Sequence, residues 1–188
     1  MSITLGGKTA TELNIRVLKG TQEPITAATR DRTLEIPGRH GAYDFGADLN
    51  VRMFALECAI LADSSSDLQT KTRALAAHLM DSQGRPRTLE LMFDVEPDRH
   101  YNVRYSGSLP VERIAAIGLF TLLLTAFDPF AYGAEQEKEQ LVETSPEAIA
   151  VESLGNIETP PVIILENEGD PGQVINGFII RSLLEIEG

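Results

Sequence analysis

The chain has 188 residues, 43% of them hydrophobic and 23% charged, which is the composition of one globular domain or of one domain and a fragment of a second. Its 16 Lys and Arg against 28 Asp and Glu give a formal net charge of −12, which argues against a protein that grips nucleic-acid phosphates. Cys58 is the single cysteine, so the sequence excludes an internal disulfide and a zinc site built from cysteines.

The first part of the chain predicts short strands around a polar stretch. Residues 13–18 and 33–36 have strand-like composition. Residues 20–32 between them are polar and contain Pro24, so this stretch forms either a long loop or a projecting hairpin. Residues 51–62 are rich in β-forming side chains and predict a strand that leads into the next element.

One segment has the periodicity of an amphipathic helix. Ser66 and Gln69 have the spacing of a capping box, while Gly84 and Pro86 are typical of the residues that follow a helix. Apolar side chains recur between them on one helical face, at Leu68, Leu75, Ala76, Leu79 and Met80. The sequence therefore predicts a helix over about residues 67–82 with one buried face.

The middle of the chain predicts a hairpin and a long strand. Apolar side chains alternate with period two in residues 87–93 and 101–105, on either side of the turn-forming residues 94–98. Residues 117–127 are mostly apolar on both faces, as expected for a strand that is covered on both sides. The architecture is mainly β with a single helix packed on it.

The chain changes character near residue 132. Residues 1–132 hold 16 acidic and 14 basic side chains, whereas residues 133–188 hold 12 acidic and two basic ones. Ten of the eleven aromatic side chains precede this point, and Phe178 is the exception. Since aromatic side chains carry much of the burial energy of a core, we expect the compact body to end here.

Three segments follow from this division: a domain over residues 1–132, an acidic connection over residues 133–153 and a C-terminal β element over residues 154–188. In the last segment, residues 161–166 and 178–186 are the predicted strands.

Two acidic groupings are the candidates for chemistry. Asp94, Glu96, Asp98 and His100 alternate around a turn and could converge on a divalent cation, although the central Gly and later Glu of a calcium loop are absent. His40, Asp44 and Asp48 could form an acid–base set, in a Gly-rich segment of unknown geometry. A solvated turn is the favoured interpretation of the first grouping.

Other signs of catalysis are missing from the sequence. It contains no His-x-x-x-His or His-Glu-x-x-His pair, no Gly-x-Ser-x-Gly elbow and no Walker loop. His78 lies in the predicted helix beside its apolar face, and Cys58 lies among apolar strand residues. We expect a protein that is not an enzyme and that needs no metal or cofactor.

Two further absences concern location. The first twenty residues have no apolar run behind a basic start, so no secretory signal is expected. The most apolar stretch, residues 114–127, is about 14 residues long, whereas a membrane-spanning helix needs about 20. We expect a protein without a membrane partner that is made in a reducing cytoplasm.

Several features in a fixed order carry a family resemblance. A Gly-rich turn and an aromatic residue in residues 36–43 (IPGRHGAY) are followed by a strand, the capped helix and the hairpin. The strand that begins at residues 118–122 (GLFTL) then closes with residues 126–132 (AFDPFAY). This succession resembles the N-terminal domain of the distal tail proteins of siphovirus-type phages and prophages, over about residues 1–132.

The resemblance implies a fold and a structural role. The fold is a β-sandwich or split barrel with one packed helix and a projecting hairpin. Copies are expected to assemble into a hexameric ring at the tip of the virion tail, after synthesis in the cytoplasm of the host bacterium. The ring would join the tail tube protein to a tail-tip lysin, fibre or receptor-binding protein, and DNA would pass through its channel.

The resemblance also implies an interface between subunits. Residues 20–32 are the best candidate for the hairpin that clasps the neighbouring subunit. The expected interface residues are Gly20, Thr21, Gln22, Glu23, Pro24, Ile25 and Thr26 in this hairpin, with Tyr43 and Phe45 near the same surface. A closed ring requires such a heterologous contact, and a hairpin can add main-chain pairing to a neighbour.

The C-terminal part departs from the family pattern. Family members often continue into a galectin-like β-sandwich of well over a hundred residues, whereas about 35 residues follow residue 154 here. Residues 160–165 and 178–180 resemble its first strands. Either the chain is truncated, or it carries a reduced C-terminal element.

Three other interpretations stay open. A different tail component, such as a tube or tube-terminator subunit, would stack or cap without a second domain. A carbohydrate-binding β-sandwich is disfavoured because Trp is absent and Phe178 is the single late aromatic residue. An enzyme would require His40 or His100 to converge with nearby carboxylates.

Overall fold

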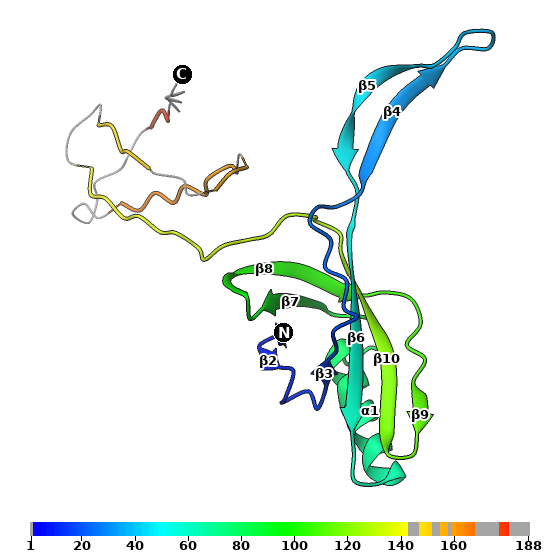
Figure 1. Cartoon of the computed structure of the whole chain (residues 1–188). Helices are drawn as coiled ribbons and strands as arrows, with labels where there is room; N and C mark the ends of the chain where they lie inside the picture. Colours follow the sequence, from blue (N-terminus) through cyan, green and yellow to red (C-terminus); the bar gives the residue numbers. More distant parts are fainter. Residues whose placement is uncertain (1, 143–146, 152–154, 158, 168–176, 181–188) are drawn as a thin grey trace. The chain divides into compact units, whose positions relative to one another are not determined.

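The structure is a computed structural model that describes residues 2–142, 147–151, 155–157, 159–167 and 177–180. The chain divides into two compact units, Met1–Glu139 and Gln140–Gly188. The assigned strands and helix of the described residues all lie in the first unit (Figure 1). In chain order they are β1 (Ile3–Leu5), β2 (Lys8–Thr9), β3 (Arg16–Val17), β4 (Thr29–Glu35), β5 (Ala42–Leu49), β6 (Arg52–Leu61), α1 (Ser65–Leu79), β7 (Thr88–Phe93), β8 (Glu96–Tyr105), β9 (Glu112–Ile114) and β10 (Ile117–Ala126).

One antiparallel sheet forms the body of the first unit. Its strand order is β2-β1-β7-β8-β10-β6-β3, and β9 pairs with the free part of β10. The β6–β10 pair is the longest, running in register from Ile117 opposite Leu61 to Ala126 opposite Arg52. The strands predicted over residues 51–62 and 117–127 and the hairpin predicted over residues 87–105 are therefore confirmed.

The core lies on one side of this sheet. Side chains from β1, β6, β7, β8 and β10 belong to a single buried cluster, which requires the sheet to curl around them. Helix α1 adds Leu68, Leu75 and Leu79 to the same cluster. Full burial of each such side chain contributes about 1.5–3 kcal/mol to stability. The prediction of a mainly β sandwich or split barrel with one packed helix is confirmed.

The helix begins and ends earlier than the sequence predicts. Its N-cap is Ser64, whose hydroxyl accepts a hydrogen bond from the Asp67 amide at 3.1 Å, and not Ser66 of the predicted capping box. At the other end Met80 is extended and pairs with Pro86, while the Leu79 carbonyl accepts a hydrogen bond from the Arg87 amide. This pairing ends the helix at Leu79, so the apolar stripe stops one residue short of Met80.

The projecting hairpin is formed by β4 and β5, and we call it the arm. The two strands make a separate two-stranded sheet, and Figure 1 shows them reaching away from the large sheet. The position predicted for this hairpin, residues 20–32, is wrong. Gln22 pairs with Ala55 of β6, and Ala27 is buried, so residues before β4 are held along the body.

The described residues of the second unit form no helix or strand. The strand predicted over residues 161–166 is therefore not formed. Of the strand predicted over residues 178–186, residues 178–180 are likewise outside any strand, and the rest lies outside the described residues. The division into residues 1–132, 133–153 and 154–188, with a C-terminal β element, stays a prediction.

Candidate assembly surface

The structure does not bring the candidate acid–base set of His40, Asp44 and Asp48 together. Asp48 binds the guanidinium groups of Arg30 and Arg32, and Asp44 accepts a hydrogen bond from the Gly46 amide at 2.8 Å. His40 lies in the turn between the two strands of the arm. Each carboxylate thus has a local structural partner, and the arm carries no acid–base geometry.

The other candidate grouping is the acidic turn between β7 and β8, for which the sequence favours a solvated turn over a cation site. His100 pairs through its backbone with Tyr132 and stacks on that ring, with the two ring centroids 5.9 Å apart. The Asp94 amide donates to the Ser2 carbonyl. Within the described ranges, no group of three or more His, Cys, Asp and Glu side chains could hold a metal ion.

Cys58 is a core residue. Its side chain is fully buried on β6, and this burial, with a smaller contribution from the charge of Glu57, raises the pKa of the thiol to about 12. A thiol that stays protonated is neither a nucleophile nor a metal ligand.

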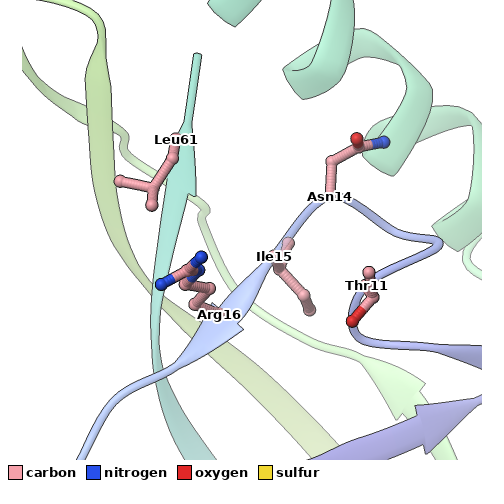
Figure 2. A pocket seen from close by; sticks show the side chains of 5 residues that line it. All are labelled: Thr11, Asn14, Ile15, Arg16 and Leu61. Carbon is pink, nitrogen blue, oxygen red and sulfur yellow. The ribbon is translucent and has the colours of Figure 1, made fainter.

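A small surface pocket lies between the segment that leads into β3 and the end of β6. It has a volume of about 230 Å³ and is lined by Thr11, Asn14, Ile15, Arg16 and Leu61. Figure 2 shows Arg16 on β3 beside Leu61 on β6, with Thr11 and Asn14 on the loop that precedes them. Arg16 is the single titratable group in this lining, so the pocket offers no pair of groups for proton transfer.

The arm has two chemically different faces. Side chains alternate along a strand, and the register places Arg30 opposite Asp48 and Leu34 opposite Tyr43. One face, the aromatic face, consists of Arg30, Arg32, Leu34, Tyr43, Phe45 and Asp48. The other, the acidic face, consists of Asp31, Thr33, Glu35, Ala42, Asp44 and Ala47.

A β-bulge keeps Asp48 on the face of the two aromatic rings. The register shifts between Asp31 and Thr33, so that β5 has one more residue than β4 at this point. Gly46 supplies the extra residue in a left-handed conformation, with φ of +88°. Asp48 follows Phe45 by three positions, so strict alternation would place the two side chains on opposite faces. The bulge places Asp48 on the same face as Phe45, where it meets Arg30 and Arg32.

The aromatic face combines charge with exposed apolar surface. Arg32 donates to Asp48 and is, with Arg30, the reason why the pKa of the Asp48 carboxyl lies below its ordinary value. Two guanidinium groups share this one carboxylate, so the face keeps a positive charge. Phe45 is 65% exposed, and Leu34 and Tyr43 are also exposed. Aromatic and arginine side chains of this kind are enriched at the centres of protein interfaces.

Residues 20–26, predicted as interface residues, lie along β6 at the root of the arm. Gln22 is fixed by its pairing with Ala55, and Gly20 packs over the Glu57 side chain. Ile25 is 98% exposed at the same root. Burial and the nearby charge of Glu96 raise the pKa of Glu23.

Arg52 holds this root in place, a role that no sequence pattern indicates. It is the first residue of β6, and its Nη2 atom donates to the carbonyls of Pro24 at 2.5 Å and Ile25 at 3.2 Å. The guanidinium carbon lies 4.6 Å from the centroid of the Tyr101 ring. Arg52 therefore ties the segment that enters the arm to the core of the body.

Residues 8–126 match a family model described as "Phage tail protein RIFT-related domain". The chain belongs to this family. The match covers more than half of this phage tail protein, including the arm and almost the whole large sheet. No curated protein matches it, and no helix among the described residues is both long and apolar enough to cross a membrane.

A solved structure shares the fold of this tail protein. The crystal structure of SPP1 Dit, titled "a Paradigm of Hub Adsorption Apparatus in Gram-positive Infecting Phages", matches it with a TM-score of 0.60 and 19% sequence identity. The match covers 71% of the tail protein and 52% of SPP1 Dit, so the tail protein spans about half the length of that chain. The predicted resemblance to the N-terminal domain of distal tail proteins is confirmed at the level of family and fold.

Proposed function

We propose that this phage tail protein is a structural hub that forms a hexameric ring at the tip of the tail. One side of the ring binds the tail tube protein, and the other binds a tail-tip lysin, fibre or receptor-binding protein. The family membership and the fold shared with SPP1 Dit, whose title describes a hub adsorption apparatus, support this role.

The arm is the observation that carries the proposal. A monomer gains little from the aromatic face, because Phe45 is 65% exposed and the Tyr43 ring is covered by Arg39 of the arm and not by a core. A hairpin that contacts the body of the next copy makes a heterologous contact, which generates a ring when the rotation closes. Residues 20–26 at the root of the arm would border the same contact.

The acidic character of the chain suits a channel for DNA. Residues 1–132 hold 16 acidic and 14 basic side chains and so have no surplus of Lys and Arg to hold DNA phosphates, and residues 133–188 add a net charge of −10. DNA therefore slides through such a ring without being bound by it. In this proposal the protein is not an enzyme and works without metal or cofactor.

The experiment compares two matched double variants with the unchanged chain. Tyr43→Ser with Phe45→Ser removes the aromatic rings, and Thr33→Ser with Glu35→Gln changes the acidic face of the same two strands. Light scattering and negative-stain images should show rings for the unchanged chain and for the acidic-face variant, and monomers for the aromatic-face variant. Rings that survive the loss of both aromatic rings would contradict the proposed role of the arm.

A tube or tube-terminator subunit is the second candidate, because the matching family model is described as a phage tail protein and names no position in the tail. The same images separate the hub from a tube subunit, because a tube subunit stacks ring upon ring into cylinders, whereas a hub gives single rings.

A further inference from the structure

The β6–β10 pair has a second apolar face, which we call the outer face. Phe54, Leu56 and Phe120 point into the core, so the alternating side chains point to the opposite side of the sheet. The outer face contains Met53, Ala55, Ala59 and Leu61 of β6, Ile117, Leu119 and Leu123 of β10, and Ile114 of β9. Met53 is 56% exposed and Ile114 is 54% exposed.

These apolar side chains are aligned across the strands. Leu61 lies opposite Ile117, which in turn lies opposite Ile114 on β9, and Ala55 lies opposite Leu123. An antiparallel sheet with one face in water normally carries polar side chains on that face. The polar side chains of β6 and β10 on the outer face are Thr125, opposite Met53, and a pair near the middle in which the Thr121 hydroxyl donates to Glu57 at 2.9 Å. The composition is that of a sheet covered on both sides.

We propose that the outer face is the seat of the arm of a second copy of this chain, whose aromatic face packs on it. This inference rests on the proposed ring and adds the receiving half of the contact between subunits.

The arm of the same chain does not cover the outer face. β5 ends at Leu49 and leads within two residues into β6, so the arm is rooted at the Arg52 end of the β6–β10 pair. The Leu61 end lies about 30 Å away, at 3.4 Å for each residue of β6. Phe45 is 65% exposed, and the Tyr43 ring lies against the Arg39 guanidinium of the arm itself, 3.8 Å from the ring centroid, so neither ring packs on the outer face of its own chain.

The arm of another copy fits the outer face in length and shape. The eight residues of β5 span about 27 Å, and the ten residues of β6 span about 33 Å. Two sheets pack face to face about 10 Å apart through apolar side chains from each. Laid along the β6–β10 pair, the arm of the second copy covers most of the apolar side chains of the outer face.

The charges of the aromatic face and of the outer face are also complementary. Arg30 and Arg32 share the single carboxylate of Asp48, which leaves a positive charge on the aromatic face. The outer face presents the carboxylates of Glu57 on β6 and Glu112 on β9. Its own cations, Arg16 and Arg104, lie on the flanking strands β3 and β8, where Arg104 is occupied over the Phe127 ring.

Disulfide trapping in the full chain tests the inference. Phe45→Cys is combined in turn with Met53→Cys, Leu61→Cys or Ile117→Cys, and each double variant is oxidised and run on a non-reducing gel. Disulfides between copies, seen as a ladder of covalent oligomers, are expected for at least one of the three pairs. The control combines Thr33→Cys, on the acidic face, with the same partners and should give no ladder; the native Cys58 is buried and does not react.

Light scattering on the same variants separates the possible failures. An assembled ring in which none of the three pairs forms a disulfide overturns the inference and leaves the ring standing. A disulfide within one chain, or trapping of Leu61→Cys by Val162→Cys of the C-terminal unit in place of Phe45→Cys, also overturns it. An unchanged chain, with Phe45 in place, that stays monomeric overturns the ring and the inference together.

Discussion

At the scale of single residues, Arg52 decides how the arm is joined to the body. Its guanidinium binds two carbonyls of the segment that enters the arm and lies against Tyr101 of the core. Sequence patterns do not reveal this role, because the partners are more than 25 positions away and two of them are backbone atoms. Tyr43 and Phe45, by contrast, stand out in sequence as aromatic residues in a Gly-rich segment, and the structure places both on one face of the arm.

Arg52→Ala should lower the free energy of unfolding by about 2 kcal/mol, because charged hydrogen bonds and a cation–π contact are lost at a partly buried position. Urea denaturation of the full chain measures this change. Arg30→Ala is the control: Arg30 makes its ion pair on the exposed arm, so its loss should leave the stability unchanged. Equal effects of the two substitutions would contradict the role given to Arg52.

Glu23 should make the protein less stable as the pH rises. Burial, and then the charge of Glu96, raise its folded pKa above the ordinary value of 4.5. The folded protein therefore holds this proton over a pH range in which the unfolded chain has lost it, and stability falls as the pH rises from about 4.5 through the raised folded pKa.

Glu23→Gln removes this effect. The difference in melting temperature between the variant and the unchanged chain should therefore shift in favour of the variant as the pH is raised from 4 to 7. Glu35→Gln, on the exposed arm, serves as the control. A gain that is the same for both variants would show that Glu23 has no special part in the pH dependence.

At the scale of elements, sequence predicts best the segments that have one buried face. Apolar residues repeat at the period of the structure in β6, β10, the β7–β8 hairpin and α1. Every second side chain of a strand faces the core, and so does every third or fourth side chain of a helix. The arm lacks this signal, since nearly all of its side chains are exposed and Gly46 interrupts the alternation. The sequence therefore favours the polar residues 20–32, which precede the arm, as the position of the hairpin.

The sequence indicates that the outer face is apolar, but it does not indicate what covers this face. Residues 117–127 predict a strand covered on both sides, and the structure provides a cover for one side. A second copy of the chain is outside what periodicity can reveal, because a pattern records that a side chain is buried and not which molecule buries it.

The helix start offers a test with a built-in control, since three serines follow one another at Ser64, Ser65 and Ser66. Ser64→Ala should lower the free energy of unfolding by about 1 kcal/mol, because its hydroxyl caps the Asp67 amide. Ser66→Ala should have little effect, since Ser66 lies inside the helix and Ala is the stronger helix former. Chemical denaturation of both variants checks the assignment, and the reverse order of effects would favour the capping box predicted from sequence.

At the scale of the whole molecule, the arm contact alone is small. A two-stranded arm about 27 Å long and about 10 Å wide covers about 270 Å² of its neighbour. The two surfaces together lose about 540 Å², whereas a stable pair of proteins buries at least about 1,200 Å². A closed ring gives every copy two such contacts, so assembly should pass from monomer to ring over a narrow range of concentration without accumulating dimers.

The molar mass of the unchanged full chain, measured by light scattering over a wide range of concentration and paired with negative-stain images, tests the central claim most directly. We expect one assembled species with a central opening, at about 120 kDa for six copies of the 20.5 kDa chain. A chain that stays monomeric at the highest concentration, or that grows into open filaments of no fixed mass, would contradict the account.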